Sequence, residues 1–385
     1  MSVFAAVITG KGTGAIATIQ LYGDSAEAIL KQIFVPQTQK TSEFATGKIL
    51  LGTITTNGET IDQVTIGCEG PDTFAINCHG NPLIVEQIMC LLQKQGIELL
   101  TAEQLLCKTF ADGNTITLEA KLMLPKTKTI EGTKIILNQT DSGLAAAAKN
   151  WVNNINLNKI TSETKTIIKA SRIAKLIIFG CRIVLAGPPN TGKSTLLNRL
   201  SGRQKAIVTD IKGTTRDWVS ANCQIGPLAV ELIDTAGLDE KLADDIDKAA
   251  KQAAVELINQ ADLVLLVLDN SEPIQQLTTG LIEKLADRKV LTVLNKSDLP
   301  ARFDPAKLPG NAASSVVQIS ALLGTGIDAL ARKICEITGT ENFDVHQPVC
   351  FTARQEQLLI QLTNADSQGQ AIAIITELLS GRLNV

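Results

Sequence analysis

An octapeptide with the chemistry of phosphate binding occupies residues 187–194, where the sequence reads GPPNTGKS. It matches GxxxxGK[ST], a pattern whose glycines let backbone N–H groups approach phosphates. Lys193 is expected to reach the β- and γ-phosphates, and the Ser194 hydroxyl to ligate Mg²⁺. A strand-like run, RIVLA, enters the loop and STLLNRL leaves it as a helix, which is the context that the pattern requires. This context disfavours the alternative, a chance glycine-rich turn in an α/β sheet.

The stretch DTAG at 234–237 ends the apolar run AVELI and is typical of a turn that senses a γ-phosphate. We expect Asp234 to meet Mg²⁺ through water, and the Gly237 N–H to meet the γ-phosphate. In Ras-like GTPases a Gln follows this glycine and orients the attacking water. Leu238 stands here instead, and its side chain neither donates nor accepts a hydrogen bond. The residues alone leave open which group replaces the Gln.

Two further stretches select the base. NKSD at 295–298 ends the run VLTVL, and Asp298 can accept hydrogen bonds from N1–H and the 2-amino group of guanine, donors that adenine does not supply there. Ser320 and Ala321 end the run VVQIS and can support the base through a backbone N–H. Each string is weak by itself, but all of them fall at carboxyl ends of expected strands, where open α/β sheets bind ligands. Together they indicate a guanine-nucleotide site.

Three regions must position these residues. Residues 181–340 alternate apolar strands with helices, which predicts a βαβ series around a mainly parallel sheet. Residues 1–118 alternate short strand-like runs with turns and helical patterns, which is typical of an α+β domain. Residues 119–180 and the tail at 341–385 have helical spacing. We therefore expect an α/β P-loop GTPase domain inserted in a helical domain and preceded by an α+β N-terminal domain.

Composition limits the class of protein. The 385 residues carry a net charge of −3, which argues against a dominant phosphate-binding surface. Eight cysteines without a CxxC pair, and only two histidines, disfavour a zinc site and favour reduced, buried thiols. No apolar run approaches 18 residues, and the first 23 residues lack a secretory pattern. The expected location is the cytoplasm, without membrane insertion.

Several motifs together resemble one group of GTPases. The loop GPPNTGKSTLLNRL, the stretch GTTRD at 213–217, DTAGL and NKSD are similar to those of the MnmE/TrmE and Era-like proteins. The runs GKGTGAIATIQLYGDSAEAIL and CHGNPLIVEQIM resemble the N-terminal domain of the MnmE family of tRNA modification GTPases. The resemblance implies a homodimer that binds GTP and GDP and acts in wobble-uridine modification. Its implied partners are tRNA and a flavin-dependent MnmG-like protein.

The resemblance also supplies a substitute for the missing Gln. In this family an apolar residue follows DxxG, and K⁺ near the phosphate loop offsets transition-state charge when two GTPase domains pair. Asn190 matches the family's K⁺-ligating Asn, with Thr209, Ile211 and Thr214 at the remaining ligand positions. Thr215 matches the Mg²⁺ ligand that accompanies the phosphate-loop serine. The alternative for Asn190 is a turn residue that tolerates unusual backbone angles.

A carboxylate is expected to orient the water. The family has a Glu early in the helix after DxxG, and the matching residue is Asp247, one methylene shorter. Asp247 and Asn190 are therefore the candidate catalytic residues. The alternative for Asp247 is a solvated acid at a helix N-terminus, which the helix dipole favours.

The full expected GTP site combines the phosphate-loop, switch and base-binding positions. It comprises Asn190, Thr191, Gly192, Lys193, Ser194, Thr195, Thr209, Asp210, Ile211, Lys212, Gly213, Thr214, Thr215, Asp234, Thr235, Ala236, Gly237, Asn295, Lys296, Asp298, Ser320 and Ala321.

The outer regions depart from the family pattern. The family's N-terminal domain binds a formyl-tetrahydrofolate-type donor, but Gln20 replaces an Arg of its second strand, so we expect a degenerate folate site and a dimerisation role for residues 1–118. His79 matches a family His and is interpreted as a structural turn residue. The chain ends in SGRLNV, without the family's Cys-Ile-Gly-Lys. A divergent regulatory or ribosome-assembly GTPase is therefore the alternative function, and the intact motifs disfavour a non-catalytic scaffold.

Overall fold

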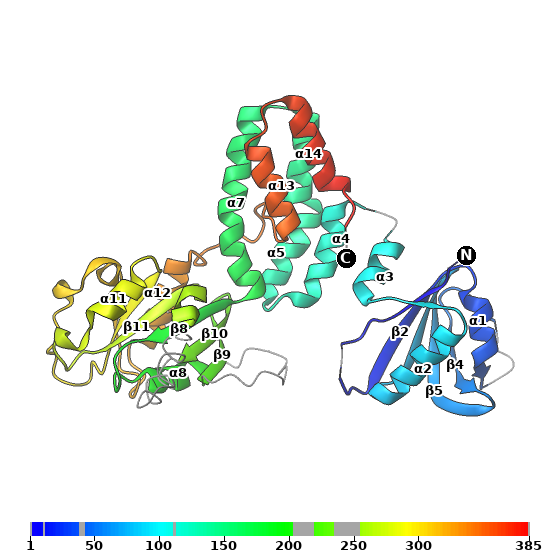
Figure 1. The fold of residues 1–385 in the computed structure, drawn as a ribbon, viewed down its shortest axis with the longest axis horizontal. Coiled ribbons are helices and arrows are strands. Elements are labelled where there is room, and N and C mark those ends of the chain that lie inside the picture. Colours follow the sequence, from blue (N-terminus) through cyan, green and yellow to red (C-terminus); the bar gives the residue numbers. More distant parts are fainter. Residues whose placement is uncertain are drawn as a thin grey trace. The chain divides into compact units, whose positions relative to one another are not determined.

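The computed structural model describes residues 2–10, 12–37, 43–110, 113–202, 219–234 and 255–383 (Figure 1). The chain forms two compact units, one comprising Met1–Gly113 with Arg382–Val385 and the other Asn114–Gly381. The division falls just before Asn114, whereas the sequence placed a boundary at 118. No helix within the described ranges combines the length and the apolar composition that crossing a bilayer needs.

The first unit is built on a seven-stranded sheet of order β3-β4-β5-β6-β2-β1-β7. Its buried residues, together with α1 and α2, form one apolar core. In β4, Leu50 and Ile54 are buried, whereas Ile49 and Leu51 face solvent, so only one face of this strand packs against the core. The elements are β1 (Phe4–Val7), β2 (Ile16–Tyr22), α1 (Ala26–Ile33), β3 (Phe34–Pro36), β4 (Ile49–Thr56), β5 (Glu59–Gly70), β6 (Thr73–His79), α2 (Pro82–Lys94), β7 (Glu98–Leu99) and α3 (Ala102–Thr109).

One turn of this unit is held by a buried carboxylate. Asp62 accepts hydrogen bonds from the backbone N–H groups of Gln63 (2.9 Å) and His79 (2.8 Å), and its Oδ1 lies 2.7 Å from Nδ1 of the His79 ring. The ring itself is largely exposed. These contacts join the start of β5 to the end of β6, just before Asn81 caps α2.

The second unit contains a six-stranded sheet of order β13-β12-β11-β8-β10-β9, in which only β9 runs antiparallel to its neighbour. Every residue of β11 and β12 is buried, as expected for central strands covered on both faces. The expected mainly parallel α/β sheet is confirmed. Its elements are β8 (Cys181–Ala186), α8 (Lys193–Ser201), β9 (Val219–Ile225), β10 (Leu228–Asp234), β11 (Leu263–Asp269), α11 (Thr279–Leu285), β12 (Val290–Asn295), β13 (Val316–Gln318) and α12 (Ile327–Thr338).

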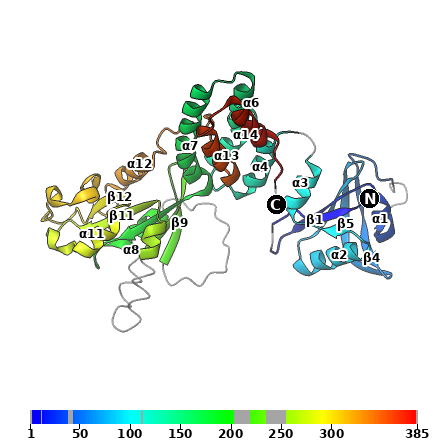
Figure 2. The ribbon, with the colours of Figure 1, turned by 45° about the horizontal axis from the view of Figure 1, so that its top comes forward.

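Helices from two distant parts of the chain pack together beside this sheet (Figures 1 and 2). The long helix α7 contacts α5 and α13, and α14 contacts α4 and α6. A single apolar core includes Trp151, Ile177 and Ile375 from the helices and Leu232 from the sheet. The helices are α4 (Thr115–Met123), α5 (Ile130–Asp141), α6 (Leu144–Asn153), α7 (Leu157–Phe179), α13 (Ala353–Thr363) and α14 (Gln368–Ser380).

A buried carboxylate joins α4 to α13. Glu119, whose side chain is 4% exposed, accepts two hydrogen bonds of 2.9 Å from the Arg354 guanidinium. It also accepts hydrogen bonds from Gln355 Nε2 (2.6 Å) and Thr352 Oγ1 (2.8 Å). Arg354 donates further to the backbone carbonyls of Glu377 and Leu378 in α14. Burial of a charge is costly unless it is paired and hydrogen-bonded, and here both conditions are met.

The segment that leads into α13 is held by polar side chains of α5 and α7. Gln139 is fully buried, and its Oε1 accepts a hydrogen bond of 2.9 Å from the Val349 N–H. Its Nε2 donates to the Gln347 carbonyl (3.2 Å). Ser171 Oγ accepts from the Cys350 N–H (2.8 Å). This segment has no regular secondary structure, and its buried backbone groups need other hydrogen-bond partners. The side chains of Gln139 and Ser171 provide them.

Candidate nucleotide-binding site

The phosphate-binding loop joins the end of β8 to the start of α8. Three residues of the loop have positive φ: Gly187 (145°), Asn190 (62°) and Gly192 (90°). A side chain on Gly187 would collide with the Val267 carbonyl, and one on Gly192 with the Asn295 side chain, so both positions require glycine. Asn190 adopts a left-handed conformation that Asn tolerates better than most residues, with its side chain exposed. The turn role considered from the sequence is thus present.

The reactive side chains of the loop are held by the loop and by β10. Lys193 is buried, and its Nζ donates to the carbonyls of Gly187 and Pro188 at 2.8 Å each. Ser194 Oγ donates to Asp234 Oδ2 at 2.6 Å. Lys193 and Ser194 are the groups that the motif directs toward phosphate and Mg²⁺. Binding therefore requires exchange of these hydrogen bonds for new ones.

The amide of Asn295 connects two loops of the site. It is 3% exposed; its Nδ2 donates to the Thr191 carbonyl (2.8 Å) and its Oδ1 accepts from the Ala321 N–H (2.9 Å). The phosphate loop and the loop after β13 are thereby fixed to the end of β12. The Ser297 N–H strengthens this junction by donating to the Ile319 carbonyl (3.0 Å).

The base-binding loops expose both polar and apolar groups. Asp298 is exposed at the turn after β12. Leu299, Leu322 and Leu323, in the same two loops, are also exposed to solvent. Arg199 of α8 fixes the second loop, because its Nε donates to the Ala321 carbonyl (2.9 Å) and its guanidinium also meets the Leu322 carbonyl. An acceptor carboxylate beside apolar side chains is a chemistry that suits a purine ring with donors on one edge.

An acid that the sequence reasoning missed lies beside the NKSD turn. Asp269 ends β11, and its Oδ2 lies 2.6 Å from Nζ of Lys296. Burial raises the pKa of Asp269, but hydrogen bonds from Lys296 and Ser271 outweigh it, and the pKa lies below its usual value. The available signal was its place at the end of the run LVLLVLD, the same sheet edge as the other site residues.

The structure therefore brings four of the expected groups to the carboxyl edge of one sheet: residues 190–195, Asp234, residues 295–298 and residues 320–321. Thr195 lies in the first turn of α8. The other expected site residues lie outside the described ranges, as does Leu238. They are Thr209, Asp210, Ile211, Lys212, Gly213, Thr214, Thr215, Thr235, Ala236, Gly237 and Asp247.

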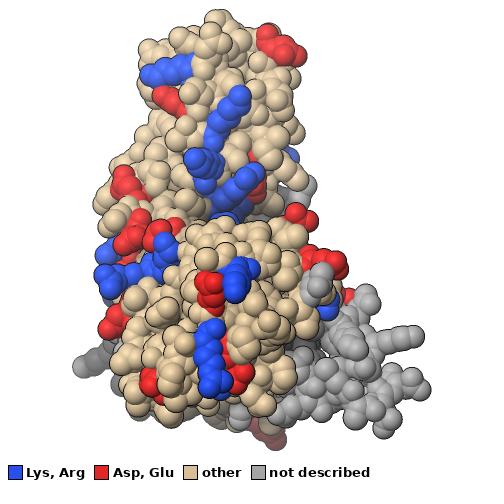
Figure 3. Space-filling model, turned by 90° about the vertical axis from the view of Figure 1, so that its left-hand side faces the viewer, with Lys and Arg blue, Asp and Glu red and all other residues tan. Residues whose placement is uncertain are grey.

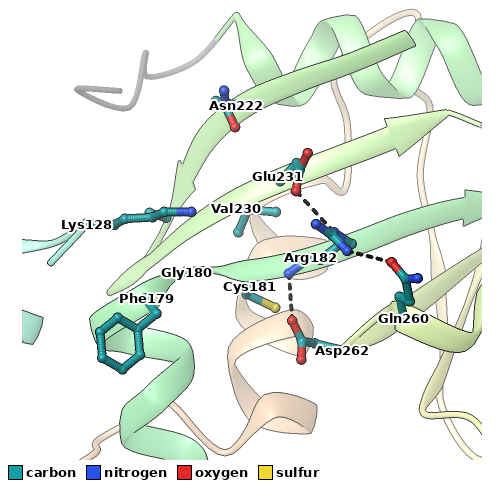
Figure 4. Close-up of a pocket in the computed structure, with 11 residues that line it drawn as sticks. Lys128, Phe179, Gly180, Cys181, Arg182, Asn222, Val230, Glu231, Gln260 and Asp262 are labelled. Carbon is teal, nitrogen blue, oxygen red and sulfur yellow. Dashed lines mark hydrogen bonds and ion pairs between the residues drawn. The ribbon is translucent and has the colours of Figure 1, made fainter. Parts of the chain in front are cut away.

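A polar pocket of about 210 Å³ lies where α7 meets the sheet (Figure 4). Arg182 crosses it: its Nε meets Glu231 Oε2 (3.1 Å), and its backbone N–H donates to Asp262 Oδ2 (2.7 Å). Burial raises the pKa of the adjoining Cys181 thiol to about 12, so the thiol stays protonated at neutral pH. The pocket lies at the start of β8 and β11, away from the edge that holds the phosphate loop, and none of the expected site residues line it.

Comparisons with known proteins agree with these motifs. Residues 182–296 match the family model described as 50S ribosome-binding GTPase, and residues 3–104 match that described as GTP-binding protein TrmE N-terminus. The tRNA modification GTPase MnmE of Enterococcus faecalis is 30% identical over 374 residues, which cover 86% of this chain and 80% of that protein. The protein of the same name from Thermotoga petrophila is 30% identical over 402 residues, which cover 93% of this chain and 87% of that protein.

Among solved structures, the G domain of the FeoB iron transporter from T. maritima is 30% identical. It covers 41% of this chain and 98% of its own, with a TM-score of 0.32.

Replacement of Asn295 by Ala should weaken GDP binding about tenfold or more. Two buried backbone groups would lose their partners, at about 1–3 kcal/mol each, and the two loops would no longer be fixed to β12. Asn311→Ala is the matched control, since Asn311 donates to the Arg288 carbonyl (2.9 Å) far from the expected site residues. Titration with a fluorescent nucleotide measures the GDP affinity of both variants. Equal GDP affinity of Asn295→Ala and the wild type would contradict the role of Asn295 in holding the two loops.

Proposed function

Because the chain belongs to the MnmE family of tRNA modification GTPases, we propose that it binds GTP and GDP at the carboxyl edge of the second sheet and hydrolyses GTP. One observation carries this conclusion most directly: Lys193, Ser194, Asp234 and Asn295 converge on the loop between β8 and α8. An ammonium, a hydroxyl and a carboxylate at a helix N-terminus form the apparatus that nucleotide phosphates and Mg²⁺ require.

We propose Mg²⁺ as the resident metal, held by Ser194 and Thr215. The described part of this donor set suits a hard cation, because Ser194 Oγ and Asp234 Oδ2 lie 2.6 Å apart and both are oxygen donors. When bound beside Ser194, Mg²⁺ would supply positive charge that offsets the negative charge of the nucleotide phosphates. Lys193 contributes a second positive charge to the same phosphates, and backbone N–H groups of the loop fix their orientation.

We propose that this GTPase domain, residues 181–340, is inserted in a helical domain formed by residues 119–180 and 341–385. The packing of α13 and α14 against α4 to α7, and the contact of Glu119 with Arg354, support the insertion. We propose a role in homodimerisation for the N-terminal domain, which the sequence predicts at residues 1–118 and whose compact unit ends at Gly113 in the structure.

The proposed cellular role is wobble-uridine modification in the cytoplasm, with tRNA and an MnmG-like flavoprotein as partners. The relatives from Enterococcus faecalis and Thermotoga petrophila are tRNA modification GTPases. The exposed side of α7 also carries Lys165, Lys169 and Arg172, spaced so that they share one side of the helix. Basic side chains lie over the helical part of the face drawn in Figure 3. Such a row can meet RNA phosphates although the whole chain is slightly acidic.

One position favours the second candidate, a divergent regulatory or ribosome-assembly GTPase. Gln20 stands where the family has an Arg, and its Nε2 donates to Glu69 Oε2 at 2.8 Å. A neutral amide beside a carboxylate does not attract the carboxylates of a folate.

We expect residues 1–118 to show no folate binding in the full-length protein, because carboxylates that lose water without meeting a cation are strongly disfavoured. Isothermal titration with formyl-tetrahydrofolate measures this, and Gln20→Arg combined with Glu69→Gln is the variant that should gain affinity. A micromolar dissociation constant for the wild type would remove the support for the second candidate and favour the modification role.

Asp298→Asn should lose guanine preference, because its carboxylate is the proposed acceptor for two guanine donors. The expected loss of GTP affinity is about 2–4 kcal/mol, with a gain for xanthosine triphosphate, whose ring presents an acceptor at the altered position. Asp304→Asn is a control, since Asp304 is exposed and pairs at the surface with Lys307. Competition titrations with both nucleotides test this; unchanged GTP affinity of Asp298→Asn would disprove the assignment.

We propose K⁺, ligated by Asn190, Thr209, Ile211 and Thr214, as the substitute for the Gln that Leu238 replaces. GTP hydrolysis should be about tenfold or more faster in K⁺ than in Na⁺ at matched ionic strength, and should rise with protein concentration as GTPase domains pair. Asn190→Gly removes the side-chain amide, while glycine still adopts the positive φ of 62° that this position has. The variant should therefore lose the stimulation of hydrolysis by K⁺ and retain GDP binding. Asp247→Ala should lower the remaining turnover.

Initial hydrolysis rates in the two salts decide the question. Equal wild-type rates in K⁺ and Na⁺ would rule out the cation. A K⁺ effect that survives in Asn190→Gly would leave Asn190 with its turn role alone.

A further inference from the structure

Lys296, the second residue of NKSD, has an unusual backbone that needs support. Its φ is +63°, in the left-handed region that residues other than glycine seldom occupy. Such a conformation persists only where surrounding contacts enforce it. The side chain of Lys296 is 34% exposed, so packing alone does not hold it.

Asp269 provides the contact that fixes this side chain. Its Oδ2 meets Lys296 Nζ at 2.6 Å, and its Oδ1 accepts from Ser271 N–H (2.8 Å) and Ser271 Oγ (2.7 Å). Its backbone is held as well, because its N–H donates to Gln276 Oε1 and its carbonyl accepts from Gln276 Nε2, both at 2.9 Å. The carboxylate is only 9% exposed, and it has little freedom to move.

The position of Asp269 in the sheet sets the direction of the lysine. Asp269 pairs in register with Asn295, the residue just before Lys296, on the neighbouring parallel strand. The ammonium is thus drawn from β12 toward the end of β11. Asp298 follows Lys296 by two residues and is exposed. A lysine released from Asp269 is a cation within the same turn as the carboxylate that must accept hydrogen bonds from guanine.

We propose that Asp269 is a positioning residue for guanine nucleotides, which holds the Lys296 ammonium away from Asp298 and stretches its apolar stem across the ends of β11 and β12. The stem then offers a surface to the purine, and the Asp298 carboxylate stays available to the two guanine donors. The inference rests on the proposed guanine site and adds a residue outside its motifs. The hydrogen bonds described above also lower the pKa of Asp269, which favours the ionised carboxylate.

A double-mutant cycle in the full-length protein tests the proposal. Asp269→Asn should weaken GDP binding about tenfold, a size typical of coupling between residues in contact. Lys296→Met keeps the apolar stem and removes the ammonium. In the Lys296→Met background, Asp269→Asn should have no further effect on GDP affinity, because the cation that Asp269 restrains is gone. Glu336→Gln, which breaks the exposed pair with Lys333, is the control and should bind GDP as the wild type does.

The outcomes separate three explanations. If Asp269→Asn weakens GDP binding equally with and without Lys296, Asp269 acts only on the fold, and the proposal is wrong. If Asp269→Asn binds GDP as the wild type does, the proposal is also wrong, although the guanine site stands. If the wild type itself does not bind GDP, the proposed function fails first. Thermal unfolding of each variant, followed alongside, should show similar midpoints for Asp269→Asn and Lys296→Met if they disrupt the same contact.

Discussion

The second unit depends on one buried charge, the carboxylate of Glu119. It receives hydrogen bonds from Thr352, Arg354 and Gln355, and Arg354 lies 235 positions later in the sequence. Every element between these residues, including the whole nucleotide-binding sheet, therefore belongs to a closed loop of chain whose two ends meet in the helices. Loss of one partner would leave the buried carboxylate incompletely hydrogen-bonded, which is strongly destabilising.

Buried polar groups also join separate segments at the nucleotide-binding edge of the sheet. Its loops are joined to one another by buried polar groups: Asn295 connects the loop before α8 to the loop after β13, and Asp269 connects β11 to the turn after β12. Loops carry many backbone groups that a core of apolar side chains cannot satisfy. Amide and carboxylate side chains at strand ends satisfy them, and in doing so they fix the distance between the phosphate and base regions.

The sequence was informative where a pattern has a local physical cause. Runs such as LVLLVLD and VLTVLN are mostly apolar and proved to be the buried central strands. GPPNTGKS adopts the strand–loop–helix arrangement that its glycines permit. Partners of isolated charges were not predictable. Glu119 lies in a Lys- and Thr-rich stretch that resembles a solvated surface, and no periodicity indicates Arg354 as its partner. The place of Asp269 at the end of an apolar run was a signal for the site, but its partner Lys296 lies after a neighbouring strand and could not be predicted from that run.

The hydrogen bonds of Lys193 and Ser194 bear on the thermodynamics of ligand entry. The lysine already donates to two carbonyls, and the serine to the Asp234 carboxylate. Phosphate oxygens that enter the loop would replace the two carbonyls as acceptors for Lys193, so the number of hydrogen bonds made by the lysine would change little. The favourable enthalpy of phosphate binding is accordingly reduced, and the release of ordered water and counter-ions supplies a larger share of the affinity. Because the loop already satisfies its own charged groups, phosphate binding to it is expected to be driven mainly by entropy.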